Sequence, residues 1–162
     1  MRLALCALAV ALATLCAAAR VSTAAGEPYP TEPGVRFQAI DVFVDSPEKL
    51  AAYQVELTYP AATVQVVGVE GGAADAYREA PHFDERGKTG GRIVLAAFTL
   101  DEDRAPEGRV RVARLHLRVR GPATPQITVR PVTAARPGGD KIDVDADVRP
   151  ARRAEGEQAT EA

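Results

Sequence analysis

The sequence predicts an all-β domain, an antiparallel β-sandwich or jelly roll of roughly seven to nine strands with little helix. Short segments rich in β-branched residues alternate apolar with polar side chains, which is the period of a strand with one covered face. Turn-forming residues separate these segments about every ten positions, as in antiparallel folds with tight connections. We therefore expect two sheets that bury their inner faces against each other.

The first strands are expected at Phe37–Val44, Tyr53–Tyr59 and Val64–Val69. Both faces of Phe37–Val44 carry apolar residues, which is typical of a central strand. In Tyr53–Tyr59 the apolar side chains alternate with polar ones more regularly than anywhere else in the chain. In the third strand, either Val66 or Val67 continues the buried face, and a glycine pair ends the strand.

A long connection at Ala73–Gly90 follows, and connections of this length are often functional. Residues Ala73–Glu79 are expected to form a short helical turn within it. The next segment, Arg92–Leu100, is apolar almost throughout, so we expect a buried central strand. An acidic turn at Asp101–Gly108 then leads into the next strand.

The remaining strands are expected at Arg109–Arg120, Gln126–Val132 and Asp140–Val148. The apolar positions of Arg109–Arg120 change parity, which predicts a β-bulge near Val112–Ala113. In Asp140–Val148, valine and isoleucine alternate with aspartates, and charges of this kind can protect an exposed sheet edge from aggregation.

Residues 1–25 predict a signal peptide. Arg2 supplies a positive charge, Leu3–Ala19 is apolar, and Ser22–Ala25 offers the small residues that cleavage needs. Both cysteines of the chain lie in this segment, so the exported protein would have no thiol for disulfides, catalysis or zinc binding. The expected location is therefore outside the cell, in the periplasm or in the cell envelope, with no stable membrane span after removal of the signal.

The folded domain is expected at residues 35–148. A Pro-rich linker is predicted before it at residues 26–34. Residues 149–162 mix charged and small residues without an apolar period, which predicts a disordered tail. Removal of Arg2 and Arg20 with the signal changes the formal charge from −2 to −4, and this mildly acidic balance argues against a nucleic-acid partner.

Three of the predicted strands resemble the core strands of the cohesin domain. The similar segments are Ala52–Leu57, Ile93–Thr99 and Val112–Leu117, and the resemblance covers about Val35–Val148. It implies a non-catalytic β-sandwich that recognises a dockerin-like protein in polysaccharide degradation. It also implies that the partner contacts one sheet face.

Candidate partner-binding residues are the polar positions of two strands that we expect to face solvent. These residues are Gln54, Glu56, Thr58, Arg114, His116 and Arg118. The alternative interpretation is that they are ordinary solvated residues, because alternation with polar residues outward is the usual pattern of a sandwich strand. A structural envelope protein without a small ligand is a further alternative.

Direct polysaccharide binding is the second functional hypothesis, because sugar rings stack on exposed aromatic rings. The chain has no tryptophan, and the phenylalanines Phe37, Phe43 and Phe98 are interpreted as core residues. Tyr77 and Phe83, together with His82, lie in the long connection and could form a ligand ridge. Alternatively, this loop folds back as a lid on the end of the sandwich.

The sequence offers little for a cofactor or for catalysis. Asp101 and Asp103 lie in one acidic turn and are candidate ligands for a structural calcium ion, which prefers oxygen ligands. No other cofactor is expected. The histidines are isolated, and we find no Gly-x-Ser-x-Gly elbow around a serine. We therefore expect a protein that is not an enzyme.

Overall fold

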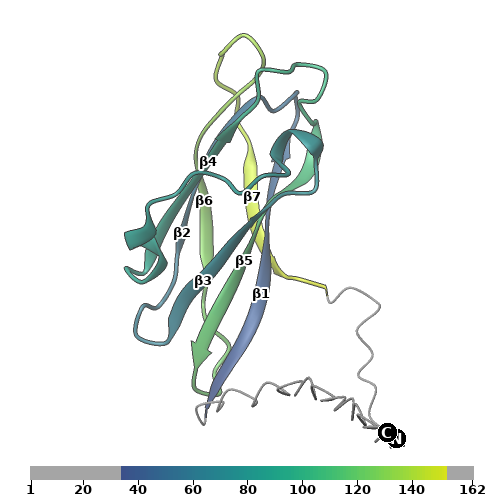
Figure 1. Ribbon diagram of the computed structural model, residues 1–162. Coiled ribbons are helices and arrows are strands. Elements are labelled where there is room, and N and C mark those ends of the chain that lie inside the picture. Colours follow the sequence, from purple (N-terminus) through teal and green to yellow (C-terminus); the bar gives the residue numbers. More distant parts are fainter. Residues whose placement is uncertain (1–33, 153–162) are drawn as a thin grey trace, which may run out of the picture. The chain divides into compact units, whose positions relative to one another are not determined.

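The computed structural model describes residues 34–152, in which seven strands form two antiparallel sheets that pack face to face (Figure 1). Sheet A has the strand order β3-β5-β1-β7, and sheet B has the order β4-β2-β6. Helix in these residues is limited to the 3₁₀ turns η1 (Asp75–Tyr77) and η2 (Glu85–Lys88). The predicted all-β sandwich with little helix is therefore confirmed.

The strand bounds follow the predicted order along the chain. They are β1 (Val35–Ser46), β2 (Ala52–Thr58), β3 (Val64–Gly71), β4 (Arg92–Phe98), β5 (Gly108–Arg120), β6 (Thr128–Ala135) and β7 (Asp145–Pro150). No helix in the described part of the chain is long and apolar enough to cross a membrane.

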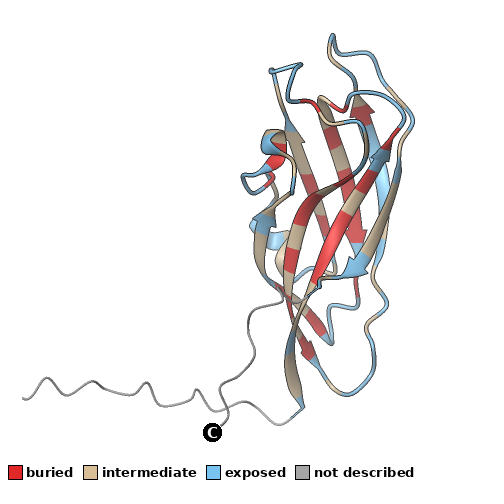
Figure 2. Cartoon of the chain, turned by 90° about the vertical axis from the view of Figure 1, so that its right-hand side faces the viewer, coloured by how far each residue is buried: buried red, intermediate tan, exposed pale blue. Residues whose placement is uncertain are grey.

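The hydrophobic core lies between the sheets, where buried and less buried positions alternate along the strands (Figure 2). Val42 and Val44 of β1 face this core from sheet A, and Val55 and Leu57 of β2 face it from sheet B. Burial of one such side chain contributes about 1.5–3 kcal/mol relative to exposure. The regular alternation predicted for Tyr53–Tyr59 therefore corresponds to the inward face of the middle strand of sheet B.

The β-bulge predicted near Val112–Ala113 is confirmed. Val42 of β1 lies opposite Ala113, but the next residue, Phe43, lies opposite Arg111, so Val112 is the extra residue. Val112 and Ala113 are both fully buried. The bulge thus lets the apolar residues before and after it face the same core, although their parity in the sequence differs.

A second bulge, in β3, decides between Val66 and Val67. The pairing with β5 passes from Val66 to Gly68 and leaves Val67 without an opposite residue. Val66 is buried and Val67 is exposed. The buried face of this strand therefore continues through Val66.

The prediction of a buried central strand at Arg92–Leu100 is wrong. β4 ends at Phe98 and is an outer strand of sheet B. Phe98 is 62% exposed and Leu100 is 90% exposed. Two other phenylalanines interpreted as core also lie outside it, because Phe37 is 69% exposed and Phe43 packs beneath the Arg109 guanidinium at 4.4 Å. An apolar run by itself does not reveal whether a second layer covers both faces of its sheet.

The last two strands are shifted from their predicted positions. β6 runs through Thr128–Ala135 and β7 through Asp145–Pro150, so each ends later than expected. The Ala151 amide also donates to the Ala39 carbonyl at 2.9 Å, and the fold therefore extends past the predicted end at residue 148. The predicted signal peptide, the linker up to residue 33 and the tail from residue 153 lie outside the described residues.

A close backbone contact at the end of β3 makes Gly71 a sensitive position. A Cβ atom built on Gly71 would lie 1.9 Å from the Arg78 carbonyl oxygen, a contact that no side chain tolerates. We expect Gly71→Ala to destabilise the domain by about 1–3 kcal/mol, because the backbone must shift. The control is Gly68→Ala in the same strand, where the Cβ would meet only the His116 ring at 3.4 Å. Equal urea midpoints for the two variants would contradict the expected close contact.

Candidate functional site

The six predicted partner-binding residues do not form one surface. Gln54, Glu56 and Thr58 belong to β2 of sheet B, whereas Arg114, His116 and Arg118 belong to β5 of sheet A. Because the sheets pack face to face, their outer faces point in opposite directions. A partner that contacts one sheet face therefore cannot contact both sets of residues. Periodicity reveals the outward residues of a strand but not the sheet to which the strand belongs.

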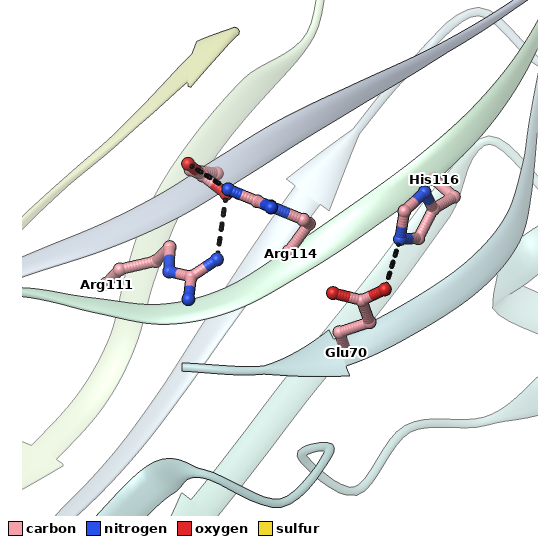
Figure 3. Close-up of polar contacts among 5 residues, drawn as sticks. Glu70, Arg111, Arg114 and His116 are labelled. Carbon is pink, nitrogen blue, oxygen red and sulfur yellow. Dashed lines mark hydrogen bonds and ion pairs between the residues drawn. The ribbon is translucent and has the colours of Figure 1, made fainter. Parts of the chain in front are cut away.

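On the outer face of sheet A, two arginines of β5 reach the same carboxylate of β1. Arg114 donates from Nε to Asp41 Oδ1 at 2.7 Å and from Nη2 to Oδ2 at 3.0 Å. Arg111 Nη1 lies 3.4 Å from the same Oδ1, so both labelled arginines converge on one carboxylate (Figure 3). Burial by itself raises the pKa of Asp41, but the hydrogen bonds and charges of Arg114 and Arg111 outweigh it, so the pKa lies below its ordinary value.

Other charged residues on this face are paired in the same way. His116 Nε2 lies 2.7 Å from Glu70 Oε1 of β3 (Figure 3). Arg109 contacts both carboxylate oxygens of Asp147 in β7, at 2.6 and 2.8 Å. The first pair joins the neighbouring strands β5 and β3, and the second reaches from β5 across β1 to β7. The predicted residues Arg114 and His116 thus have partners inside the protein, and their pairing is consistent with a structural role.

The Asp41 cluster predicts an acid-sensitive contribution to stability. Because the pKa of Asp41 is lower in the folded protein than its ordinary value of 3.8, its contribution is fully present above that pH and is lost as the pH falls below it. We expect Asp41→Asn to be less stable than the wild type at about pH 7, with the difference shrinking toward about pH 2. Urea unfolding across this range measures the effect.

Glu107→Gln is the control for the Asp41 experiment. It also removes one carboxylate, but from an exposed position outside the cluster. It therefore separates the local effect from the change in net charge. A stability difference between Asp41→Asn and the wild type that stays constant with pH would contradict the pairing.

On the outer face of sheet B, Glu56 is buried, although we predicted an exposed residue that contacts a partner. Its side chain is only 8% exposed and is held between Arg92 of β4 and Arg130 of β6. Arg92 Nε donates to Oε2 at 2.5 Å, and Arg130 Nε donates to Oε1 at 2.9 Å. The hydrogen bond from Arg92, supported by Arg130, lowers the pKa of Glu56 although desolvation acts against it. Glu56 is therefore a buried anchor that joins all three strands of the sheet.

Next to this ion cluster, the outer face of sheet B is apolar and open. Phe98 stands over small residues of the neighbouring strands, with Ala52 opposite it in β2 and Ala135 opposite Ala52 in β6. A shallow cavity of about 240 Å³ lies over these residues. Leu100 lines an adjoining hollow together with Phe98, Ala52 and Ala135. We call the area formed by Ala52, Ala96, Phe98, Leu100 and Ala135 the Phe98 surface.

The Phe98 surface is not evident from the sequence, because Phe98 ends an apolar run that predicts a core strand. A signal was present, since both parities of β4 are apolar and only one of them can face the core of a two-layer sandwich. The predicted neighbours Gln54 and Thr58 lie on the same outer face, with Gln54 half-buried beside Ala96 and Thr58 exposed. The predicted residues Gln54 and Thr58 thus share one sheet face with Phe98 and its alanine neighbours.

The aromatic ridge predicted in the long connection does not form. Tyr77 is buried in the core, where its hydroxyl donates to the Leu50 carbonyl at 2.5 Å and its ring meets Tyr53 edge-on at 5.0 Å. Phe83 is half-buried against the core. His82 is exposed, and its backbone pairs with Ala96 at the outer edge of β4. The loop therefore folds back as a lid, which was the alternative interpretation, because these aromatic rings gain more from burial than from exposure.

The candidate calcium ligands Asp101 and Asp103 lie in one exposed turn. Asp101 Oδ1 accepts the Asp103 amide at 3.1 Å, and Asp101 Oδ2 pairs with Arg104 at 3.1 Å. Within residues 34–152, no group of three or more histidine, cysteine, aspartate or glutamate residues is placed to hold a metal ion. The contacts seen for Asp101 are those that stabilise the turn itself.

Comparison with known proteins relates this chain to cohesins by fold. No family model matches the chain, and no curated protein matches it. A non-cellulosomal cohesin from the archaeon Archaeoglobus fulgidus has a TM-score of 0.55 at 15% identity, covering 68% of this chain and 75% of that one. A type I cohesin–dockerin complex from Clostridium thermocellum has a TM-score of 0.55 at 11% identity, covering 70% and 84%. The described domain thus has a cohesin-like β-sandwich fold.

Proposed function

We propose that this protein is an exported, non-catalytic binding module that recognises a dockerin-like protein through the Phe98 surface, within polysaccharide degradation. The observation that carries the proposal is the open apolar area around Phe98 on a cohesin-like sandwich. Large contiguous apolar patches are uncommon on monomeric proteins and often mark interaction sites. Export rests on the sequence of residues 1–25.

The Phe98 surface has the composition of a protein interface. Phe98 is a large exposed aromatic residue, and binding energy in interfaces concentrates at such anchors. The small side chains of Ala52, Ala96 and Ala135 leave room beside it for apolar side chains of a partner. Arg92 and Arg130 flank Glu56 on the same face with side chains 63% exposed, so we expect acidic residues at the rim of the partner.

Two further observations support a protein partner and a role without catalysis. One structural relative was solved as a cohesin–dockerin complex, so this fold is able to bind a dockerin. His116 is bonded to Glu70 on the open face of sheet A, and His82 is exposed at the edge of sheet B. Within residues 34–152, neither imidazole is hydrogen-bonded to a serine or threonine hydroxyl, as a catalytic base that activates such a nucleophile would be.

The test is capture of a partner from the secretome and envelope fraction of the source organism on the immobilised protein, with calcium and with chelator. We expect recovery of a protein that carries duplicated Asp-rich calcium loops, lost on chelation because such loops fold around the ion. Its affinity for the wild type is then measured by calorimetry. Failure to capture such a protein would overturn the dockerin assignment and favour a structural envelope role.

Phe98→Asp tests which surface is used. We expect it to weaken binding of the captured partner at least about tenfold, since a charge would be placed in an apolar contact. The matched control is Phe37→Asp, because Phe37 is similarly exposed, at 69% against 62%, but lies on sheet A. Equal loss with both variants, or loss with Phe37→Asp alone, would overturn the assignment to sheet B.

A further inference from the structure

A polar cavity of about 580 Å³ lies beside the Phe98 surface, between the loop that contains η1 and the turn after β4. Its volume is in the range of small-molecule sites. Its lining includes Asp75, Arg78, Glu79, Phe98, Asp101 and Arg104. This cavity adjoins the apolar hollow over Ala52 and Ala96, since His82, Ala97 and Phe98 line both.

The first wall of the cavity is anchored to the core. Tyr77, at the centre of the η1 loop, is buried and bonded to the Leu50 carbonyl at 2.5 Å. Its own carbonyl accepts the Gly72 amide at 2.6 Å. Further along the same loop, the His82 backbone is bonded in both directions to Ala96, at 2.8 and 3.0 Å. These contacts hold the loop in place without a ligand.

The second wall is the turn that follows β4. Thr99 Oγ1 accepts the Asp101 amide at 3.1 Å, and Asp101 Oδ1 accepts the Asp103 amide at 3.1 Å. The Arg104 amide donates to the Asp101 carbonyl at 3.2 Å, which closes the turn. With both walls held by such contacts, a ligand would not have to order them, and this preorganisation favours binding.

The charges of the lining disfavour an anionic ligand. Asp75, Glu79 and Asp101 carry three negative charges, and Arg78 and Arg104 carry two positive charges. Each arginine is paired with an aspartate of its own turn, Arg78 with Asp75 and Arg104 with Asp101. These pairs neutralise both guanidinium charges and leave the carboxylate of Glu79 in excess, so a phosphate or carboxylate ligand would meet net negative charge, whereas the remaining N–H donors can still serve a neutral ligand.

From this combination we propose that the cavity binds a neutral saccharide. Vicinal hydroxyl groups can donate to carboxylates such as Glu79 and accept from guanidinium groups such as that of Arg104 in the same complex. The apolar face of a sugar ring matches the exposed ring of Phe98. The inference goes beyond the proposed protein partner and does not depend on it. This site differs from the aromatic ridge predicted from the sequence. Tyr77 is buried and anchors the loop, and the aromatic ring proposed to stack on the sugar is that of Phe98.

The test is calorimetric titration of the purified protein with cellohexaose, xylohexaose and, as an anionic oligosaccharide of equal length, hexagalacturonate. We expect binding of at least one neutral hexasaccharide and much weaker binding of hexagalacturonate. Phe98→Ala and Glu79→Ala should each reduce the affinity at least about tenfold. Phe37→Ala, which removes an exposed ring on the other sheet, should leave the affinity unchanged.

Glu79→Ala also separates this inference from the proposed protein partner. Glu79 lines the polar cavity and is absent from the linings of the two hollows that make up the Phe98 surface. The variant should therefore lose saccharide binding while retaining partner capture. No binding of either neutral hexasaccharide, equal binding of hexagalacturonate, or wild-type affinity in Glu79→Ala with unchanged thermal unfolding would overturn the saccharide assignment.

Discussion

Val55→Asp is expected to unfold the domain. Val55 is fully buried in the middle strand of sheet B and faces the core. An aspartate there would place a carboxylate among apolar side chains, and an uncompensated buried charge costs several kcal/mol. A domain of this size has a total stability of only about 5–15 kcal/mol, so this single change removes a large part of it or all of it.

The measurement is circular dichroism with thermal unfolding, compared with Thr58→Asp. Thr58 belongs to the same strand, but its side chain is exposed and its cross-strand neighbour is Arg92. The control therefore adds the same charge to the same strand without burying it. A folded Val55→Asp with a cooperative transition near that of the wild type would contradict the assignment of Val55 to the core.

Tyr77→Ala should have the second largest effect. It removes a buried ring that packs against Tyr53 and a hydroxyl that donates to Leu50. Burial raises the pKa of Tyr77, so the hydroxyl remains protonated and can donate throughout the ordinary pH range. Replacement of a large buried aromatic residue by alanine typically costs about 3–5 kcal/mol.

Tyr77→Phe separates the ring from the hydroxyl. It retains the packing and leaves only the Leu50 carbonyl without its partner, which should cost about 0.5–1.5 kcal/mol. Urea unfolding of both variants gives the two contributions. If Tyr77→Ala were as stable as the wild type, Tyr77 would not anchor the long connection, and the preorganised wall of the polar cavity would lose its explanation.

The inward face of β2 was predictable because its alternation is local. Tyr53, Val55 and Leu57 are separated by polar residues, and no other arrangement buries all three while the chain remains extended. The bulge at Val112 was predictable for the same reason, since a change of parity inside one strand needs an extra residue. Both features follow from residues that are neighbours in the sequence.

The Glu56 cluster and the exposure of Phe98 were not predictable in this way. Glu56 has the spacing of a solvated residue, and its burial depends on Arg92 and Arg130, which reach it from two different strands. Phe98 has the surroundings of a core residue, and its exposure depends on sheet B having no further layer over its outer face in the described part of the chain. Each outcome requires knowledge of which strands are adjacent.

The all-β class, the order of the strands along the chain and the inward face of most strands follow from local periodicity and turn chemistry, and are therefore readable in the sequence. Three features become visible only in the folded chain: Gln54 and Arg114 face opposite directions, Tyr77 is an anchor, and Phe98 lines both an apolar hollow and a polar cavity. The physical reason is that pairing between distant strands sets which faces are covered, and that pairing is encoded by the packing of the whole core rather than by any one segment.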